Sequence, residues 1–369
     1  MVRTKLRPAA LALCAAAAAA FVLWSAVSGF GQAAASDESR ELSFLKRQFE
    51  DLSHRLDQLE KSIDDILWFE RVGDVAWVDK VRIVGPPRWK EPNPAAQGAG
   101  NPIKFYTYLF IPRDMDRSKK CPLIVLPHGG SHASFDTYHT HIIREMIGQG
   151  YVVVAPDYRG STGYGPGIYR LVDYGGLENE DVFASRNFVV DNYPFVDKDR
   201  VGIVGWSHGG LIALMNAFDH PEGYQACFAG NPVSDLVARM GYKDQSYRDE
   251  FEASYSIGQS AEANVREYLR RSPVSHAAKL RIPLLVHGNT NDEDVNVLEV
   301  ERLVQALKAA GRTFEYEIFK DAPGGHSMDR LDIRNAKTIR LKIYDFLARY
   351  LKPPRPFKSL EDLQRAGYF

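Results

Sequence analysis

Residues 201–215 constrain the fold more than any other segment, because they predict a strand, a tight turn and a helix in immediate succession. The apolar run 201–204 predicts a buried strand, and residues 211–215 predict a helix. Between them stands Gly205-Trp206-Ser207-His208-Gly209-Gly210. In such a turn the serine hydroxyl is lifted above the sheet edge, and the flanking residues are glycines because a Cβ would collide with neighbouring backbone. The segment therefore predicts a nucleophile elbow and acyl-transfer chemistry.

The composition is that of a globular protein. The chain has 369 residues, 45% of them hydrophobic, which is enough to bury one large core. Its formal net charge is −1 with no basic stripe, which argues against nucleic acid as a partner. Beyond Cys14 the only cysteines are Cys121 and Cys227, in predicted strands that we do not expect to be neighbours. We therefore predict buried thiols and no disulfide between them.

Residues 1–35 have the pattern of a targeting segment. Arg3, Lys5 and Arg7 precede an apolar stretch over residues 9–30, and Ala33-Ala34-Ala35 offers small residues for cleavage. This pattern predicts an export signal peptide, although the apolar stretch is also long enough for an uncleaved membrane anchor. Either outcome predicts a periplasmic or extracellular protein, held in the inner membrane in the second case.

Residues 36–70 predict a helix with a heptad seam. Apolar residues recur in alternating steps of three and four, with charged residues between them: Leu42, Leu45, Phe49, Leu52, Leu56, Leu59, Ile63 and Ile66. A strict heptad repeat favours pairing with another copy of the same helix, so we predict a homo-oligomer. The alternative is an amphipathic helix that lies on the globular domain.

From residue 101 onwards, strand-like and helix-like segments alternate, which is typical of a doubly wound, mostly parallel α/β sheet. We expect strands at 103–111, 123–126, 151–155, 201–204, 226–229, 284–286 and 314–319. Expected helices are 139–149, 178–192, 211–218, 298–310 and about 335–350. Residues 234–280 carry no strand signal and predict a helical excursion over the site. The predicted divisions are a connecting segment (71–100), the α/β domain (101–353) and a C-terminal tail (354–369).

A serine hydroxyl needs a base to take its proton and an acid to orient that base. In an elbow fold the order along the chain is serine, acid, histidine. His326 lies between the last predicted strand and the last predicted helix, where a general base belongs. The acid should follow strand 284–286, where Asp292, Glu293 and Asp294 stand together and the residues alone do not choose between them.

Acyl transfer also needs N–H donors for the developing oxyanion. We expect one from the backbone of His208 and another from Gly129 or Gly130, which follow strand 123–126. No cysteine or acid completes a ligand set with the nearby histidines, so we expect no metal and no cofactor. Those histidines are His128, His132, His139 and His141.

Together these segments resemble the catalytic domain of the prolyl oligopeptidase family of serine peptidases, from about residue 101 to residue 351. The resemblance rests on the elbow and on five further pieces: His128-Gly129-Gly130, Asp157-Tyr158-Arg159-Gly160-Ser161-Thr162-Gly163-Tyr164-Gly165, residues 196–201, Arg271-Ser272-Pro273 and Gly325-His326. The family's catalytic aspartate stands three residues before a valine, which here selects Asp292, with Asp294 as the alternative. The resemblance implies an α/β-hydrolase fold with Ser207 as nucleophile, Asp292 as orienting acid and His326 as general base.

Three features depart from the family. No run of repeated strands for the family's β-propeller precedes Asn101, so size selection and proline preference are not carried over. Asp294 stands where some members have a substrate-binding arginine, and His128 stands where some have an oxyanion tyrosine. We expect Asp294 to favour a positively charged substrate group, and Tyr158 to be a second substrate contact.

These observations predict a serine peptidase that cleaves peptides through an acyl-enzyme. A carboxylesterase acting on small esters is the alternative of the same fold, because the same triad cleaves activated esters more readily than amides. The third hypothesis is a non-catalytic oligomeric binding scaffold, against which the intact Ser207, Asp292 and His326 argue.

Overall fold

The computed structural model describes the backbone of residues 8–368 and the side chains of residues 39–368. The chain divides into two compact units, Met1–Leu56 and Asp57–Phe369. The described part of the first unit is helical and belongs to α1 (Pro8–Val72). The predicted signal or anchor over residues 1–35 depends on side chains outside the described residues. Among the residues whose side chains are described, no helix is long and apolar enough to cross a membrane.

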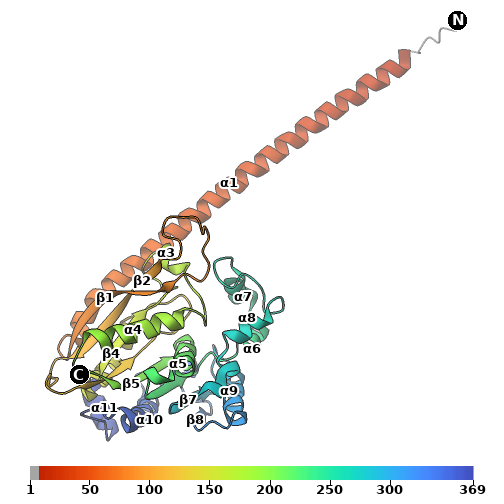
Figure 1. Ribbon diagram of the computed structural model, residues 1–369. Coiled ribbons are helices and arrows are strands. Elements are labelled where there is room, and N and C mark those ends of the chain that lie inside the picture. Colours follow the sequence, from red (N-terminus) through yellow and green to blue (C-terminus); the bar gives the residue numbers. More distant parts are fainter. Residues whose placement is uncertain (1–7, 369) are drawn as a thin grey trace. The chain divides into compact units, whose positions relative to one another are not determined.

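The second unit is built around an eight-stranded sheet with the order β1-β2-β4-β3-β5-β6-β7-β8 (Figure 1). The strands are β1 (Ala76–Pro87), β2 (Pro102–Pro112), β3 (Cys121–Val125), β4 (Val152–Asp157), β5 (Val196–Trp206), β6 (Ala226–Gly230), β7 (Leu284–Asn289) and β8 (Glu315–Phe319). β2 pairs antiparallel with both β1 and β4, and the remaining pairs are parallel. This mixed, mostly parallel sheet confirms the predicted fold class.

The central strands are apolar on both faces because helices cover both sides of the sheet. Every residue of β3, β4, β6 and β7 is buried. Successive residues of a strand point to opposite faces, so Leu123 and Val125 pack in one core cluster and Ile124 packs in the other. The sequences of these strands are therefore nearly continuous apolar runs.

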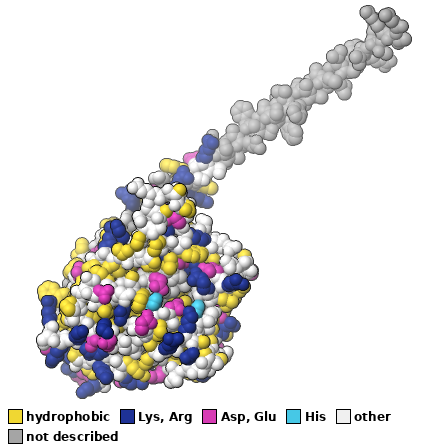
Figure 2. Space-filling view, viewed as in Figure 1, with side chains coloured by type: hydrophobic (Ala, Val, Ile, Leu, Met, Phe, Trp, Pro, Cys, Tyr) yellow, Lys and Arg dark blue, Asp and Glu magenta, His cyan; other side chains and the backbone are white. Residues whose placement is uncertain are grey.

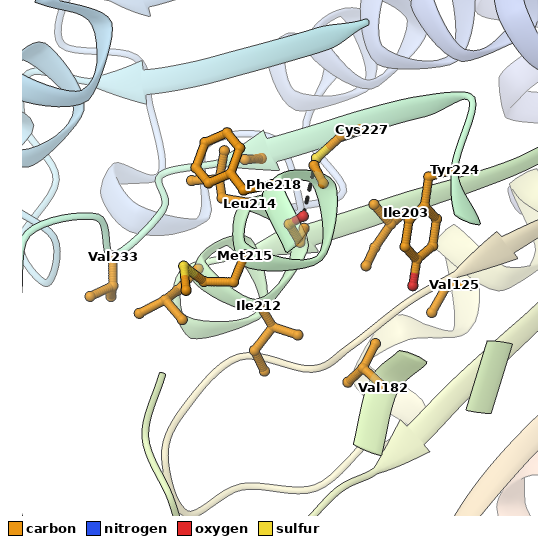
Figure 3. Packing of buried hydrophobic residues seen from close by; sticks show 14 of the residues in the cluster. Val125, Val182, Ile203, Ile212, Leu214, Met215, Phe218, Tyr224, Cys227 and Val233 are labelled. Carbon is orange, nitrogen blue, oxygen red and sulfur yellow. Dashed lines mark hydrogen bonds between the residues drawn. The ribbon is translucent and has the colours of Figure 1, made fainter. Parts of the chain in front are cut away.

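Helices α4, α5 and α9 contribute to the first core cluster, and α2, α10, α11 and the end of α1 contribute to the second. The helices after α1 are α2 (Thr140–Gln149), α3 (Pro166–Tyr169), α4 (Glu178–Asn192), α5 (His208–Asp219), α6 (Leu236–Tyr242), α7 (Gln245–Glu252), α8 (Val265–Arg270), α9 (Val297–Ala309), α10 (Arg334–Leu351) and α11 (Leu360–Gly367). Figure 3 shows part of the first cluster, which includes Ile203 of β5, Ile212 of α5 and Val182 of α4. The predicted helical excursion corresponds to α6, α7 and α8, which gather at one end of this unit in Figure 1.

Sequence reasoning missed three elements, of which the shortest is the four-residue helix α3. β1 falls in the segment predicted as a connection, and α11 falls in the segment predicted as a tail. β1 is an edge strand whose Trp77 and Val84 are exposed, so it lacks the continuous apolar run of the central strands. α11 is too short for its periodicity to stand out, and a capping box between Ser359 and Asp362 fixes its start.

Residues 57–72 of α1 belong to the second unit and are anchored in it. Trp68 is fully buried, and Lys61 is only 4% exposed. The heptad residues of this stretch stay exposed: Leu59 at 57%, Ile63 at 51% and Ile66 at 70%. This part of the helix thus lies on the globular unit, as the alternative interpretation expects, but it does so through residues outside the heptad seam.

The two cysteines of the α/β sheet are free and buried. Cys121 lies in β3 and Cys227 in β6, and β5 separates these strands in the sheet. Burial raises the pKa of both thiols above the ordinary value. The prediction of buried thiols without a disulfide is confirmed for this pair.

The surface of the second unit carries both signs of charge. Figure 2 shows Lys and Arg side chains interspersed with Asp and Glu side chains on the face that it presents. Exposed ion pairs of this unit join neighbouring elements, such as Lys342 with Glu317 and Arg349 with Glu315. Interspersed charge of this kind agrees with the net charge of −1.

Candidate active site

Ser207 occupies the sharp turn between β5 and α5. Its φ of 58° and ψ of −124° are values that residues other than glycine rarely adopt, as expected at a nucleophile elbow. The flanking glycines are sterically required. A Cβ on Gly205 would lie 2.0 Å from the carbonyl oxygen of Gly209, and a Cβ on Gly209 would lie 2.4 Å from that of Pro127. Strain of this kind persists only where the surrounding structure enforces it.

His326 and Asp292 are in direct contact. His326 lies between β8 and α10, and Asp292 lies in the loop after β7. The Nδ1 atom of His326 lies 2.9 and 2.8 Å from the two carboxylate oxygens of Asp292. The Asp292 side chain is 1% exposed, and its Oδ1 also accepts hydrogen bonds of 2.8 Å from the backbone N–H groups of Asp294 and Val295. Because a carboxylate accepts a hydrogen bond from Nδ1–H, this contact leaves Nε2 as the basic nitrogen.

The loop that carries His326 is held by two glycines and by polar side chains. Gly324 and Gly325 have φ values of 103° and 53°, in the left-handed region that favours glycine. The Glu293 carboxylate accepts a 3.0 Å hydrogen bond from the backbone N–H of His326. Asn289 donates from Nδ2 to the carbonyl oxygen of Gly325 at 2.9 Å. Of the three candidate acids, Glu293 therefore binds the backbone of the histidine and not its ring.

Contacts through the end of β6 bring Ser207 and His326 to the same corner of the sheet. The backbone N–H of Ser207 donates to the carbonyl oxygen of Gly230 at 2.9 Å. The next residue, Asn231, donates from Nδ2 to the carbonyl oxygen of His326 at 3.0 Å. Within residues 39–368 no hydrogen bond joins Ser207 Oγ to His326, and such bonds are often long in enzymes without substrate.

The predicted oxyanion donors lie next to Ser207. The N–H of His208 is the first of α5, where backbone N–H groups have no partner within the helix. A Cβ on Gly129 would lie 3.4 Å from Ser207 Cβ, so the loop that begins with His128, here called the oxyanion loop (residues 128–136), passes close to the serine. Gly130 has a φ of 78°, which favours glycine. The structure thus brings His208, Gly129 and Gly130 together near the serine.

The side chain of His208 ties the oxyanion loop to the elbow. Its Nδ1 lies 3.0 Å from the carbonyl oxygen of Gly130, and its Nε2 lies 2.5 Å from Oε1 of the buried Glu178. Because a carbonyl oxygen can only accept, Nδ1 carries a proton. Tyr174 stacks on the imidazole with ring centroids 3.9 Å apart. Sequence reasoning missed Glu178 and Tyr174, which belong to no motif and lie far from the serine in the chain.

His128, the first residue of the oxyanion loop, packs on Tyr158. Both are buried, and their rings stack with centroids 4.3 Å apart. Burial lowers the pKa of His128 to about 4, so its ring is neutral near pH 7. The sequence predicts a substrate contact for Tyr158, but this side chain is 0% exposed and its hydroxyl donates to the carbonyl oxygen of His128 at 2.8 Å. Tyr158 therefore supports the loop.

Asp294 lies at the edge of the site, on the Nε2 side of His326. Its side chain is 40% exposed, and its Oδ2 is 3.7 Å from Nε2. Arg239 lies 3.3 Å from its Oδ1, and Lys243 forms a second ion pair with it. Burial alone would raise the pKa of Asp294, but the hydrogen bond from Lys243 and the charge of Arg239 outweigh burial and lower it. A cationic substrate group would therefore compete with two protein cations for this carboxylate.

The four histidines near the oxyanion loop engage separate partners. Each stacks on a different ring: His128 on Tyr158, His132 on Tyr169, His139 on Phe135 and His141 on Tyr368. Among residues 39–368, no group of three or more His, Cys, Asp or Glu side chains is placed to hold a metal ion. We assign these four rings a packing role.

Sequence comparison identifies relatives of this chain. A profile described as the prolyl oligopeptidase family matches residues 137–354. The acylamino-acid-releasing enzyme of Sus scrofa is 29% identical over 243 residues, which cover 64% of this chain and 32% of that protein. Dipeptidyl peptidase 8 of Homo sapiens is 28% identical over 254 residues, which cover 66% of this chain and 27% of that protein. The chain thus spans about a third of the length of the curated relatives it matches.

Solved structures of peptidases share the fold. Pyrococcus horikoshii acylaminoacyl peptidase superposes with a TM-score of 0.61 at 19% identity, covering 80% of this chain and 45% of that one. A Mycobacterium tuberculosis puromycin-hydrolyzing peptidase superposes with a TM-score of 0.59 at 23% identity, covering 75% and 39%. At these identities the likeness shows the fold alone, which is the α/β-hydrolase fold that the sequence motifs imply.

Proposed function

The chain belongs to the prolyl oligopeptidase family, and on that premise we propose that it is a serine peptidase that hydrolyses peptide bonds through an acyl-enzyme on Ser207. The observation that carries this proposal is the contact of His326 Nδ1 with both carboxylate oxygens of Asp292, close to a serine in an elbow conformation. A histidine oriented in this way can activate a hydroxyl nucleophile at neutral pH.

The proposed reaction has two halves. In the first, Ser207 Oγ attacks the carbonyl carbon of the amide while His326 Nε2 takes the hydroxyl proton, and backbone N–H groups of His208 and Gly129 stabilise the oxyanion. The C–N bond then breaks, and His326 gives its proton to the leaving amine. In the second half, His326 takes a proton from water as the water attacks the acyl-serine, and Ser207 recovers its proton as the acid leaves.

An active-site-directed fluorophosphonate tests the nucleophile. The probe should label the folded protein, and mass spectrometry of the digest should place the adduct on Ser207. Ser207→Ala should abolish labelling, and Ser118→Ala, in an exposed loop, should leave it unchanged. Folded wild-type protein that does not react, or that reacts equally after Ser207→Ala, would refute the proposal.

A comparison of substrates separates the peptidase from the carboxylesterase. Because the relatives are named as acylamino-acid-releasing and dipeptidyl enzymes, N-acetylated aminoacyl anilides and dipeptidyl anilides with a free amino group are the first amides to assay. A peptidase turns over at least one of these as well as nitrophenyl esters. Ester turnover with no amide turnover would remove the peptidase claim and leave the carboxylesterase.

We further propose that the catalytic unit acts outside the cytoplasm, directed there by residues 1–35. The support is the order of basic residues, apolar stretch and small residues in this segment. Cell fractionation and N-terminal sequencing of the mature protein test it. Recovery in the periplasm or medium with a new N-terminus near residue 36 indicates a cleaved signal, and an intact N-terminus in the membrane fraction indicates an anchor. Protein with an intact N-terminus in the cytoplasm contradicts the proposal.

We also propose that the chain self-associates through the heptad seam of α1. All eight seam residues are more than half exposed: Leu42 55%, Leu45 56%, Phe49 74%, Leu52 54%, Leu56 52%, Leu59 57%, Ile63 51% and Ile66 70%. A charge in the seam of a coiled coil disfavours pairing. Leu45→Glu with Leu52→Glu should therefore lower the mass found by sedimentation, whereas Ser43→Glu, outside the seam, should not. An unchanged mass in the seam variant would refute self-association through this face.

A further inference from the structure

Lys61 of α1 is a buried cation beside the oxyanion loop. Its side chain is 4% exposed, and its Nζ lies 3.1 Å from Oδ2 of Asp157, which is 0% exposed. The same ammonium donates a hydrogen bond to the carbonyl oxygen of Phe135. The stem of Lys61 passes Gly163 so closely that a Cβ there would lie 2.6 Å from Lys61 Cβ. Both the ammonium and the stem of Lys61 are therefore enclosed by residues in and next to the oxyanion loop.

Asp157 completes a clamp on the backbone of Phe135. Its Oδ1 accepts a 2.6 Å hydrogen bond from the N–H of Phe135, while Lys61 binds the carbonyl of the same residue. Oδ1 also lies 3.8 Å from Nε2 of His128, at the start of the oxyanion loop. The Lys61–Asp157 pair thus contacts the loop at both ends.

Two further residues of α1 hold the far end of the loop and Thr137, the residue that follows it. Asp64 accepts hydrogen bonds from the N–H and the hydroxyl of Thr137, at 3.0 and 2.6 Å. Trp68 stacks on Phe135 with ring centroids 5.5 Å apart and nearly parallel planes. The near end of the loop lies beside the elbow, because a Cβ on Gly129 would be 3.4 Å from Ser207 Cβ. The loop that offers the oxyanion donors is therefore fixed between the elbow and α1.

We propose that Lys61 is a positioning residue of the active site, which holds the oxyanion loop in place through Asp157 and Phe135. The inference rests on the proposed function, because it concerns the donors of the same oxyanion hole. Donors stabilise a transition state only if they stay fixed on the position where charge develops. A displacement of about 1 Å can lower a rate by about 10²-fold. Without Lys61 the buried Asp157 carboxylate would lose its cation, and the loop would lose one side of its clamp.

The predicted signature of Lys61→Met is a change in kcat rather than KM. The substitution keeps the apolar stem and removes the ammonium. We expect kcat to fall by about 10- to 100-fold, while KM stays within about threefold, because the oxyanion forms only after substrate binds. A peptide aldehyde that forms a tetrahedral adduct with the serine should bind more weakly by a similar factor, whereas a purely structural role would not single out this ligand.

Lys80→Met is the matched control. Lys80 of β1 pairs with Asp65 of α1 at 2.6 Å, so it also joins this helix to the sheet, but its ammonium donates to Asp65 and not to the loop. We expect its kcat and aldehyde affinity to stay within about twofold of wild type. Lys61 lies about 200° around the helix from Ile63 of the heptad seam, so Lys61→Met should also leave the oligomeric mass unchanged.

A double variant keeps the proposal testable if Lys61→Met does not fold. Lys61→Met with Asp157→Asn leaves no unpaired buried charge and retains an oxygen for the N–H of Phe135, and we expect the same loss of kcat. Wild-type kcat and aldehyde affinity in either folded variant, or equal losses in Lys61→Met and Lys80→Met, would overturn the proposal. If wild-type protein neither hydrolyses amides or esters nor reacts with fluorophosphonate, the proposed function itself fails, which is a distinct result.

Discussion

Replacing Asp292 by Asn tests how His326 is oriented. The carboxylate faces Nδ1 with both oxygens, and Oδ1 also accepts hydrogen bonds from the backbone N–H groups of Asp294 and Val295. In Asp292→Asn the amide oxygen can keep the two backbone bonds, so we expect the loop to keep its conformation. The amide NH₂ then faces His326 Nδ1, and a donor there favours the tautomer that carries its proton on Nε2.

A histidine protonated on Nε2 cannot take the proton of Ser207. In a serine protease triad the equivalent change lowers kcat by about 10⁴-fold, which is about 5.4 kcal/mol at 1.36 kcal/mol for each factor of ten. We expect a similar loss here, because Asp292 is 1% exposed and both of its oxygens contact the ring. KM should stay close to the wild-type value, because Asp292 lies behind the histidine and does not touch substrate.

Asp294→Asn is the control, because Asp294 stands two residues away but lies 3.7 Å from Nε2 and pairs with Lys243. Steady-state kinetics on an anilide substrate, with a thermal melt to verify folding, compare the two variants. We expect Asp294→Asn to keep most of the wild-type kcat. Retention of more than about a tenth of kcat by Asp292→Asn, or an equal loss in Asp294→Asn, would refute the orienting role of Asp292.

Further predictions concern stability. Arg340→Met should lower the free energy of unfolding, measured by denaturant titration, by about 3–5 kcal/mol, because it leaves the buried Glu145 carboxylate without its cation; a loss under about 1 kcal/mol would contradict this. Burial lowers the pKa of His287 to about 3 from an ordinary 6.5, so its contribution to stability is complete above pH 6.5 and is lost as pH falls towards 3. His287→Phe should therefore flatten the fall in Tm between about pH 6.5 and 4, and an unchanged slope would contradict the assignment. A hydrogen bond with Glu180 raises the pKa of His220, so this pair stabilises the fold only where the histidine is protonated. Glu180→Gln should therefore lower Tm more below pH 6.5 than at pH 9, and an equal effect at both pH values would contradict this assignment.

The elbow and the histidine loop could be predicted because each depends on a few consecutive residues. The glycines around Ser207 are needed because a single turn leaves no room for a Cβ. Gly324 and Gly325 are favoured because the two backbone positions before His326 are left-handed. The parallel strands could be predicted because burial on both faces leaves continuous apolar runs. Features that depend on a few consecutive residues can therefore be predicted from a single sequence.

Contacts between distant segments could not be predicted from the sequence. Glu178 contacts His208, which is 30 residues away in the sequence, and Lys61 contacts Asp157, which is almost a hundred residues away. No sequence motif marks either pair. The choice between Asp292 and Asp294 depends on how one loop turns, which the three adjacent acids do not reveal. The spacing to Val295, taken from the family, pointed to the residue that contacts Nδ1 in the structure.

The central claim is that Ser207 carries the acyl group of the substrate during turnover. Mixing the enzyme with an activated acyl substrate, quenching in acid within the first turnover and mapping the digest by mass spectrometry measures this directly. We predict a mass increase equal to the acyl group on the peptide that contains Ser207, and no increase in Ser207→Ala. Hydrolysis by wild-type protein with the acyl group on another residue, or undiminished hydrolysis by Ser207→Ala, would contradict the claim.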